Sequence, residues 1–164
     1  GGFVGLGGGV AADLAVCLWG HSNGGQIMLS VAAILGKRGD TRVKGVTLWA
    51  PVSKPFPYSI LYYTDEADDQ GKWLRRAVAE FEQMYNVYDY SIDRYLEWIT
   101  MPVQVQQGTA DDAVPTEWSD QLVRGLRARE QEVTYYVYPG GDHDLRPGWE
   151  TVVARDVAFF GSLQ

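Results

Sequence analysis

Short apolar runs alternate along the chain with stretches in which apolar residues recur every three or four positions. Four runs rich in β-branched or aromatic residues predict strands: Leu14 to Trp19, Val43 to Trp49, Val103 to Gln107 and Val133 to Tyr138. The helical spacing predicts three helices: Asn23 to Leu35, which Gly36 would end, Thr116 to Glu130, and Trp149 to Phe160. Strands that alternate with helices are typical of a parallel sheet covered on both faces. We therefore expect an α/β fold, with a mostly parallel sheet and helices on both faces.

The turn between the first predicted strand and the first predicted helix has the sequence Gly20-His21-Ser22-Asn23-Gly24-Gly25. A Gly-x-Ser-x-Gly pattern at a strand-to-helix turn is typical of a nucleophile elbow, in which a strained backbone exposes the serine hydroxyl. Such a turn needs small residues on both sides of Ser22, and Gly20 and Gly24 leave that room. The backbone N–H of Asn23 would lie at the positive end of the helix and stabilise an oxyanion. The alternative is a glycine-rich turn with an incidental serine.

A serine nucleophile needs a base, and the chain has only two histidines. His21 is next to Ser22 on the turn, so its side chain should point away from the serine and pack or hydrogen-bond beneath the turn. His143 follows the last predicted strand, and α/β enzymes place catalytic groups at such strand ends. We therefore predict His143 as the base, against the alternative of a surface histidine without a role.

A carboxylate that orients the histidine should lie between Ser22 and His143 in the chain. Asp111 and Asp112 follow the predicted strand Val103 to Gln107 and meet that condition. The residues themselves do not choose between the two aspartates. An acidic pair in a turn is also often a solvated turn or a helix cap.

Three segments resemble the catalytic motifs of the prolyl oligopeptidase family of serine hydrolases, within the α/β-hydrolase superfamily: Gly20 to Gly25, Gln107 to Pro115 and Gly141 to His143. The resemblance extends over residues 14–161. It implies Ser22 as the nucleophile, Asp111 as the acid and His143 as the base. The chain departs from the family at three positions, where the family usually has an apolar residue, a histidine and a glycine: Gln106, Gln107 and Asp144.

In that superfamily four strands and two helices precede the nucleophile, whereas only 21 residues precede Ser22 here. The N-terminal strands are therefore expected to be missing, and the chain resembles the C-terminal part of the catalytic domain. Residues 1–9 are expected to form a glycine-rich leader, because Gly7 to Gly9 lie too close to Ser22 to be the early loop that supplies a second oxyanion donor. We treat residues 1–164 as a single domain.

The alternation of strands and helices stops between Pro51 and Met101. This stretch holds more than half of the chain's aromatic residues: Phe56, Tyr58, Tyr62, Tyr63, Trp73, Phe81, Tyr85, Tyr88, Tyr90, Tyr95 and Trp98. Within it, Trp73 to Tyr85 has helical spacing. In α/β-hydrolases an insert at this place commonly covers the active site, so we expect residues 52–101 to form an aromatic-rich cap over apolar substrate groups. Alternatively the rings hold the insert onto the sheet. A run of four acidic residues is expected to be a solvated loop rather than a cation site: Asp65, Glu66, Asp68 and Asp69.

The composition is that of a globular domain, with 46% hydrophobic and 21% charged residues. The net charge of −7 argues against nucleic acid or anionic membranes as partners. No apolar run approaches the roughly 18 residues of a membrane span. The single cysteine, Cys17, excludes a disulfide within the chain, and the counts of cysteine and histidine predict no metal cluster and no cofactor. Nothing resembles a signal peptide, which leaves the compartment open with the cytoplasm favoured.

The expected reaction is hydrolysis of an ester or peptide bond in a small-molecule or peptide substrate, through an acyl-enzyme on Ser22. The resemblance permits carboxylesterases and peptidases alike, and the lack of an evident peptide-anchoring charge cluster favours an esterase. A noncatalytic hydrolase remnant or interaction module is the alternative. A dienelactone-type hydrolase is disfavoured, because it would have cysteine in place of Ser22. The acyl preference, the second oxyanion donor and the oligomeric state stay open.

Overall fold

Four strands run parallel in one sheet, in the order β1, β2, β3, β4, in the computed structural model, which describes residues 15–163. The strands are β1 (Val16–His21), β2 (Val43–Trp49), β3 (Val103–Gly108) and β4 (Val133–Tyr138). The predicted α/β fold is confirmed, and each predicted strand is present within two residues of its predicted ends. The glycine-rich leader predicted for residues 1–9 lies outside the described residues. Because all four strands point the same way, their carboxyl ends meet at one edge of the sheet.

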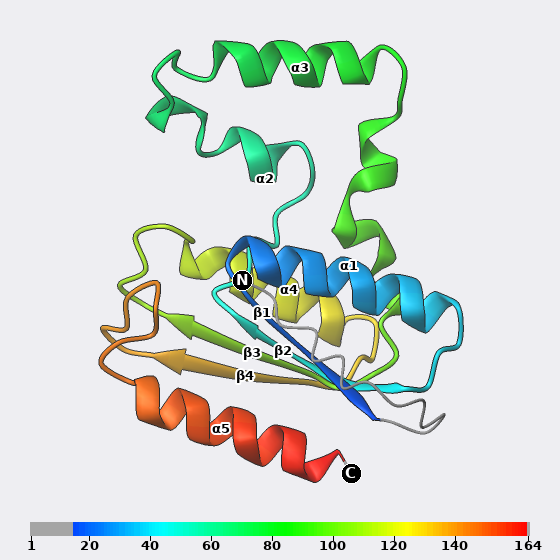
Figure 1. The fold of residues 1–164 in the computed structure, drawn as a ribbon, viewed down its shortest axis with the longest axis vertical. Coiled ribbons are helices and arrows are strands. Elements are labelled where there is room, and N and C mark those ends of the chain that lie inside the picture. The colour runs from blue at the N-terminus through cyan, green and yellow to red at the C-terminus, as the bar shows by residue number, and fades with distance from the viewer. Residues whose placement is uncertain (1–14, 164) are drawn as a thin grey trace, which may run out of the picture.

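Helices cover both faces of this sheet (Figure 1). On one face lie α1 (Asn23–Lys37) and α4 (Thr116–Arg127), and on the other lies α5 (Trp149–Ser162). The larger core fills the space between the sheet and the first two helices, with fully buried side chains that include Leu29, Val46, Val105 and Leu126. A smaller cluster lies against α5: Trp49, Tyr138, Leu145 and Val152.

The ends of α1 and α4 differ from the prediction for identifiable reasons, and α5 ends at Ser162 rather than at the predicted Phe160. Helix α1 continues through Gly36 to Lys37, and a Cβ on Gly36 would lie 1.9 Å from the carbonyl oxygen of Trp98. This glycine therefore permits close packing rather than ending the helix. Helix α4 stops at Arg127, before the predicted Glu130, because Glu130 adopts a left-handed backbone with φ of 58°.

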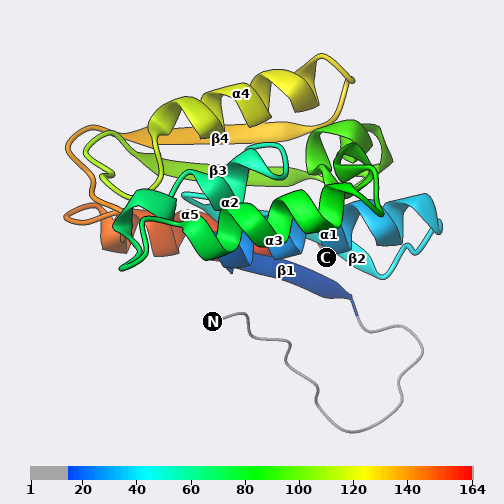
Figure 2. The ribbon, with the colours of Figure 1, turned by 90° about the horizontal axis from the view of Figure 1, so that it is seen from above.

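Residues 52–101 form short helices that project from the α1 and α4 side of the sheet (Figure 1). They are α2 (Tyr58–Leu61), η1 (Thr64–Glu66), α3 (Lys72–Glu82), η2 (Val87–Tyr90) and η3 (Ile92–Trp98). Seen from above, α3 crosses over α1 and leaves α4 uncovered (Figure 2). The helix predicted over Trp73 to Tyr85 is present as α3, which begins at Lys72 and ends before the predicted end, at Glu82.

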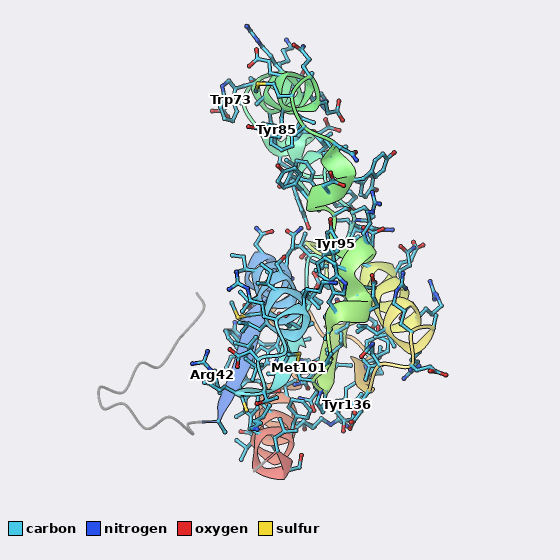
Figure 3. The ribbon with its side chains drawn as sticks, turned by 90° about the vertical axis from the view of Figure 1, so that its right-hand side faces the viewer. Arg42, Trp73, Tyr85, Tyr95, Met101 and Tyr136 are labelled. Carbon is cyan, nitrogen blue, oxygen red and sulfur yellow. The ribbon has the colours of Figure 1, made fainter. Side chains whose placement is uncertain are left out.

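The aromatic side chains of this segment have different environments. The η3 helix joins the main core through Ile92 and Leu96, close to the sheet. Figure 3 shows Trp73 and Tyr85 at the far end of the segment, and Trp73 is 73% exposed. The rings of Tyr95 and Trp98 pack against the same core, so they attach the segment to the body, whereas Trp73 does not.

Helix α5 is held to the sheet by polar as well as apolar contacts. The carboxylate of Asp156, which is 7% exposed, accepts hydrogen bonds from four side chains of β2 and β3: Thr47, Trp49, Gln104 and Gln106. No local pattern in the sequence marks Asp156 as a contact of this kind. None of the helices within residues 15–163 is both long and apolar enough to cross a membrane.

Glycine-to-alanine variants test whether Gly36 is needed for the packing at the end of α1. Replacing Gly36 with alanine in the Gly36→Ala variant should lower the free energy of unfolding by about 1–3 kcal/mol, because the new methyl group overlaps the Trp98 carbonyl. In the control variant, Gly161→Ala in α5, the added Cβ would meet nothing within 4 Å. This variant should be neutral or stabilising by up to about 1 kcal/mol. Urea denaturation measures both values. Equal effects of the two variants would contradict the packing role of Gly36.

Candidate active site

Ser22 lies on a strained turn between β1 and α1. Its φ of 57° and ψ of −123° fall outside the regions that non-glycine residues ordinarily adopt. Backbone hydrogen bonds hold this conformation: the Ser22 N–H donates to the Trp49 carbonyl at 2.9 Å, and the Ser22 carbonyl accepts from the Val52 N–H at 3.1 Å. The end of β2 therefore clamps the turn, which places Ser22 at the carboxyl edge of the sheet.

The glycines around Ser22 differ in what they permit. A Cβ on Gly20 would lie 2.4 Å from the carbonyl oxygen of Gly24, so this position needs a glycine, as expected. A Cβ on Gly24 would meet nothing within 4 Å, so the expectation that Gly24 leaves necessary room was wrong. The second crowded position is Gly25, where a Cβ would lie 2.7 Å from that of Pro51. The tight contacts at Gly20 and Gly25 thus pack the end of β1, the start of α1 and Pro51, which follows β2, against one another.

His143 and Asp111 form a hydrogen-bonded pair between the loops that follow β4 and β3. The Nδ1 atom of His143 lies 3.0 Å from each carboxylate oxygen of Asp111. The Asp111 side chain is 0% exposed, and it also accepts from the backbone N–H groups of Ala113 and Val114. Asp112 is exposed and is not the partner of His143. The structure therefore distinguishes the two aspartates that the residue pattern left open.

His21 connects the Ser22 turn to the His143 loop. Its Nε2–H donates to the carbonyl oxygen of His143 at 2.9 Å, and the two imidazole rings have centroids 4.5 Å apart. Since His21 precedes Ser22 directly, this contact brings the serine turn beside the loop that carries His143. Among residues 15–163, neither the Ser22 hydroxyl nor Nε2 of His143 has a hydrogen-bond partner. Catalytic hydrogen bonds often tighten only when substrate binds.

The charges of this group are set by burial and by the hydrogen bonds. Burial by itself would raise the pKa of Asp111, but the bonds from His143, Val114 and Gln107 outweigh it and hold the pKa below its usual range. The Asp111 carboxylate raises the pKa of His143, against the opposing effect of burial. Burial lowers the pKa of His21, and the hydrogen bond to the His143 carbonyl opposes that effect. The pair with Asp111 thus favours a proton on His143.

Gln107, a departure from the residues usual in the family, supports the Asp111 side chain. It is fully buried at the end of β3, and its amide nitrogen donates to Asp111 at 2.9 Å. Its amide oxygen accepts from the hydroxyl of Ser119 on α4 at 2.7 Å. Gln107 therefore holds Oδ2 of the Asp111 carboxylate, whereas the two backbone N–H groups hold Oδ1.

Tyr63 brings the segment 52–101 into contact with the Asp111 loop. Its hydroxyl donates to the carbonyl oxygen of Ala113 at 3.0 Å, and burial raises the pKa of Tyr63 to about 12. The ring belongs to a cluster with Tyr62 and with Trp118 of α4, whose ring centroid lies 4.8 Å from that of Tyr62. An aromatic surface thus borders the loop that carries Asp111.

Asn23 and Cys17 are the other residues that the sequence pattern singled out. Asn23 is exposed and is the first residue of α1, so its backbone N–H is among those with no partner inside the helix. Cys17 is half-buried in β1. Within the described part of the chain, no group of His, Cys, Asp and Glu side chains could hold a metal ion.

Comparisons with known proteins identify a family and a fold. A model of the prolyl oligopeptidase family matches residues 8–161. A search by sequence among curated proteins found no match.

Solved structures with the same fold include peptidases and an esterase. A Mycobacterium tuberculosis puromycin-hydrolysing peptidase is 22% identical, with a TM-score of 0.69 over 90% of this chain and 22% of its own. Porphyromonas gingivalis dipeptidyl peptidase 4 is 17% identical, with a TM-score of 0.64 over 90% of this chain and 19% of its own. Acetyl xylan esterase 1 from Thermoanaerobacterium sp. JW/SL YS485 is 18% identical, with a TM-score of 0.59 over 89% of this chain and 45% of its own. At these identities the similarity shows the fold, and the chain spans less than half the length of each of these proteins.

The two histidines should titrate on opposite sides of the ordinary histidine pKa of about 6.5. His143 is expected above it because of Asp111, and His21 below it because of burial. In the Asp111→Asn variant the pKa of His143 should fall, because the carboxylate that stabilises the imidazolium is gone. NMR of the imidazole signals measures both values, and the His21→Gln variant assigns them. A His143 pKa that Asp111→Asn does not change would contradict the coupling of the pair.

Proposed function

The chain belongs to the prolyl oligopeptidase family, and we propose that it is a serine hydrolase that cleaves an ester or peptide bond through an acyl-enzyme on Ser22. His143 is the base, and Asp111 is the acid that orients it. The observation that carries the proposal is the buried pair of Asp111 and His143 beside the strained turn of Ser22. Serine, histidine and carboxylate act together in this way on several unrelated folds.

The proposed reaction has two steps. The Ser22 hydroxyl attacks the substrate carbonyl carbon while Nε2 of His143 takes the hydroxyl proton. The carbonyl oxygen becomes negatively charged and accepts a hydrogen bond from the Asn23 N–H. The imidazolium then gives its proton to the leaving alcohol or amine. Water then attacks the acyl carbon and gives a proton to His143. His143 returns this proton to the Ser22 oxygen as the acyl bond breaks and the acid product leaves.

The environment of Asp111 suits its proposed role. A carboxylate with a lowered pKa stays ionised at neutral pH, so it can hold the Nδ1–H of His143 and leave Nε2 free to accept the serine proton. The ionised carboxylate also stabilises the imidazolium that each step forms. The orientation of the ring is thus set before substrate arrives, which reduces the reorganisation that the reaction requires.

We further propose that residues 52–101 are a cap of the same domain and contribute to the substrate site. The aromatic cluster of Tyr62, Tyr63 and Trp118 adjoins Val52 and Val114, which lie next to the Ser22 turn and the Asp111 loop. Rings in this position would bury an apolar part of a small substrate and exclude water. No nucleic acid is expected as a partner of a chain with a net charge of −7.

A fluorophosphonate probe tests the proposed nucleophile. The folded chain should be labelled, and Ser22→Ala should abolish labelling because no other hydroxyl lies on the strained turn. Ser162→Ala, a change of an exposed serine near the end of α5, should leave labelling unchanged. Intact-mass spectrometry counts the adducts. A chain that circular dichroism shows to be folded and that is never labelled would contradict the proposal and favour the noncatalytic remnant.

Paired substrates distinguish an esterase from a peptidase. A p-nitrophenyl ester and an aminoacyl p-nitroanilide release related chromophores from an alcohol-type and an amine-type leaving group. We expect Ser22-dependent release from the ester and none from the anilide, because an esterase acts on the activated ester alone whereas a peptidase cleaves both. Release from the anilide that is lost in Ser22→Ala would assign the chain to the peptidases and would leave the proposed nucleophile unchanged.

A further inference from the structure

Asp156 is a buried carboxylate that the proposed reaction does not use. One oxygen, Oδ1, accepts from Thr47 at 2.8 Å, from Gln104 at 2.7 Å and from Gln106 at 2.6 Å, and Oδ2 accepts from the Trp49 indole at 2.8 Å. No described lysine or arginine forms a salt bridge with it. Burial raises the pKa of Asp156, and the four donors oppose that effect. An apolar residue would attach α5 to the sheet at lower cost, so the carboxylate suggests a second role.

One branch of this network reaches the Ser22 turn. The Trp49 indole donates to Asp156, and the backbone carbonyl of the same residue accepts the Ser22 N–H at 2.9 Å. The Trp49 ring also packs edge-on against Trp149 at the start of α5. Any shift of Trp49 would therefore move the carbonyl that holds the strained backbone of Ser22.

A second branch reaches the loops that carry Asp111 and His143. Gln106 donates to Asp156 and accepts from the hydroxyl of Tyr138, the last residue of β4. The Tyr138 carbonyl accepts the N–H groups of Thr109 and Gly141, which lie in the loops that carry Asp111 and His143. The neighbour of Gln106 in β3, Gln107, donates directly to Asp111. The network thus joins the ends of β3 and β4.

We propose that Asp156 is a positioning residue, which fixes the ends of β2, β3 and β4 relative to one another and so sets the geometry of Ser22 and His143. The inference rests on the proposed function of these two residues. It differs from a purely structural role, in which Asp156 would only hold α5 to the sheet. In that case its loss would lower stability and leave the active-site groups as they are.

The Asp156→Asn variant tests the proposal with a nearly unchanged volume. The amide nitrogen cannot accept a hydrogen bond, so the variant loses the bond from Trp49 or those made to the other oxygen. We expect the rate constant for fluorophosphonate labelling of Ser22 to fall about tenfold or more, because small displacements of reacting groups reduce rates strongly. We also expect a changed His143 pKa by NMR, in a chain that is still folded by circular dichroism.

Asp120→Asn is the matched control. Asp120 on α4 accepts from the hydroxyl of Tyr135 at 2.8 Å, so it also joins a helix to β4. Tyr135, however, packs in the core between the sheet and the helices α1 and α4. This variant should lower the melting temperature without changing the labelling rate or the His143 pKa. A labelling rate and a His143 pKa in Asp156→Asn that match those of Asp120→Asn would overturn the proposal.

Two further outcomes are covered by the same measurements. If the unaltered chain is not labelled, the proposed function fails, and the His143 pKa alone decides whether Asp156 positions that residue. If Asp156→Asn does not fold, Tyr138→Phe removes one branch with a smaller change and should slow labelling about threefold. Tyr135→Phe, its control on the same strand, should not slow it. Equal labelling rates for the two tyrosine variants would then overturn the proposal.

Discussion

The hydrogen bond between Asp111 and His143 depends on the parallel arrangement of the sheet. The two residues are far apart in the chain and follow β3 and β4, whose carboxyl ends lie side by side. Ser22 follows β1 at the same edge, and its strained backbone is held by the end of β2. All four strands therefore contribute to one group of residues, and a strand shifted by one position would separate them.

The layers around the sheet stabilise that edge in different ways. Helix α4 supplies Ser119, which holds Gln107 and through it the Asp111 carboxylate. Helix α5 supplies Asp156, whose partners continue to the Ser22 turn and to the end of β4. The segment 52–101 adds Tyr63, which contacts the loop of Asp111. Buried polar groups are costly unless they are satisfied, and here their hydrogen bonds link the helices to the residues of the candidate site.

The local sequence predicted the strands and most helices because their apolar patterns reflect burial against the sheet. It also predicted the turn at Ser22 and the candidates Asp111 and His143, because strand ends and loops of this kind have recognisable residue patterns. Features that depend on distant contacts were not predictable. Gly36 faces the backbone of Trp98, and Gly25 rather than Gly24 is crowded by Pro51, so neither contact has a local pattern. Asp156 is likewise one acidic residue of an amphipathic helix until the fold places four donors around it.

In the proposed reaction the Ser22 hydroxyl attacks the substrate carbonyl carbon while Nε2 of the nearby His143 accepts the serine proton. A crystal structure of the chain after reaction with a phosphonate inhibitor tests it most directly. We predict phosphorus bonded to the oxygen of Ser22, with Nε2 of His143 within hydrogen-bonding distance of an adduct oxygen and Nδ1 still paired with Asp111. An adduct on a different residue, or a His143 ring directed away from the adduct, would contradict the account.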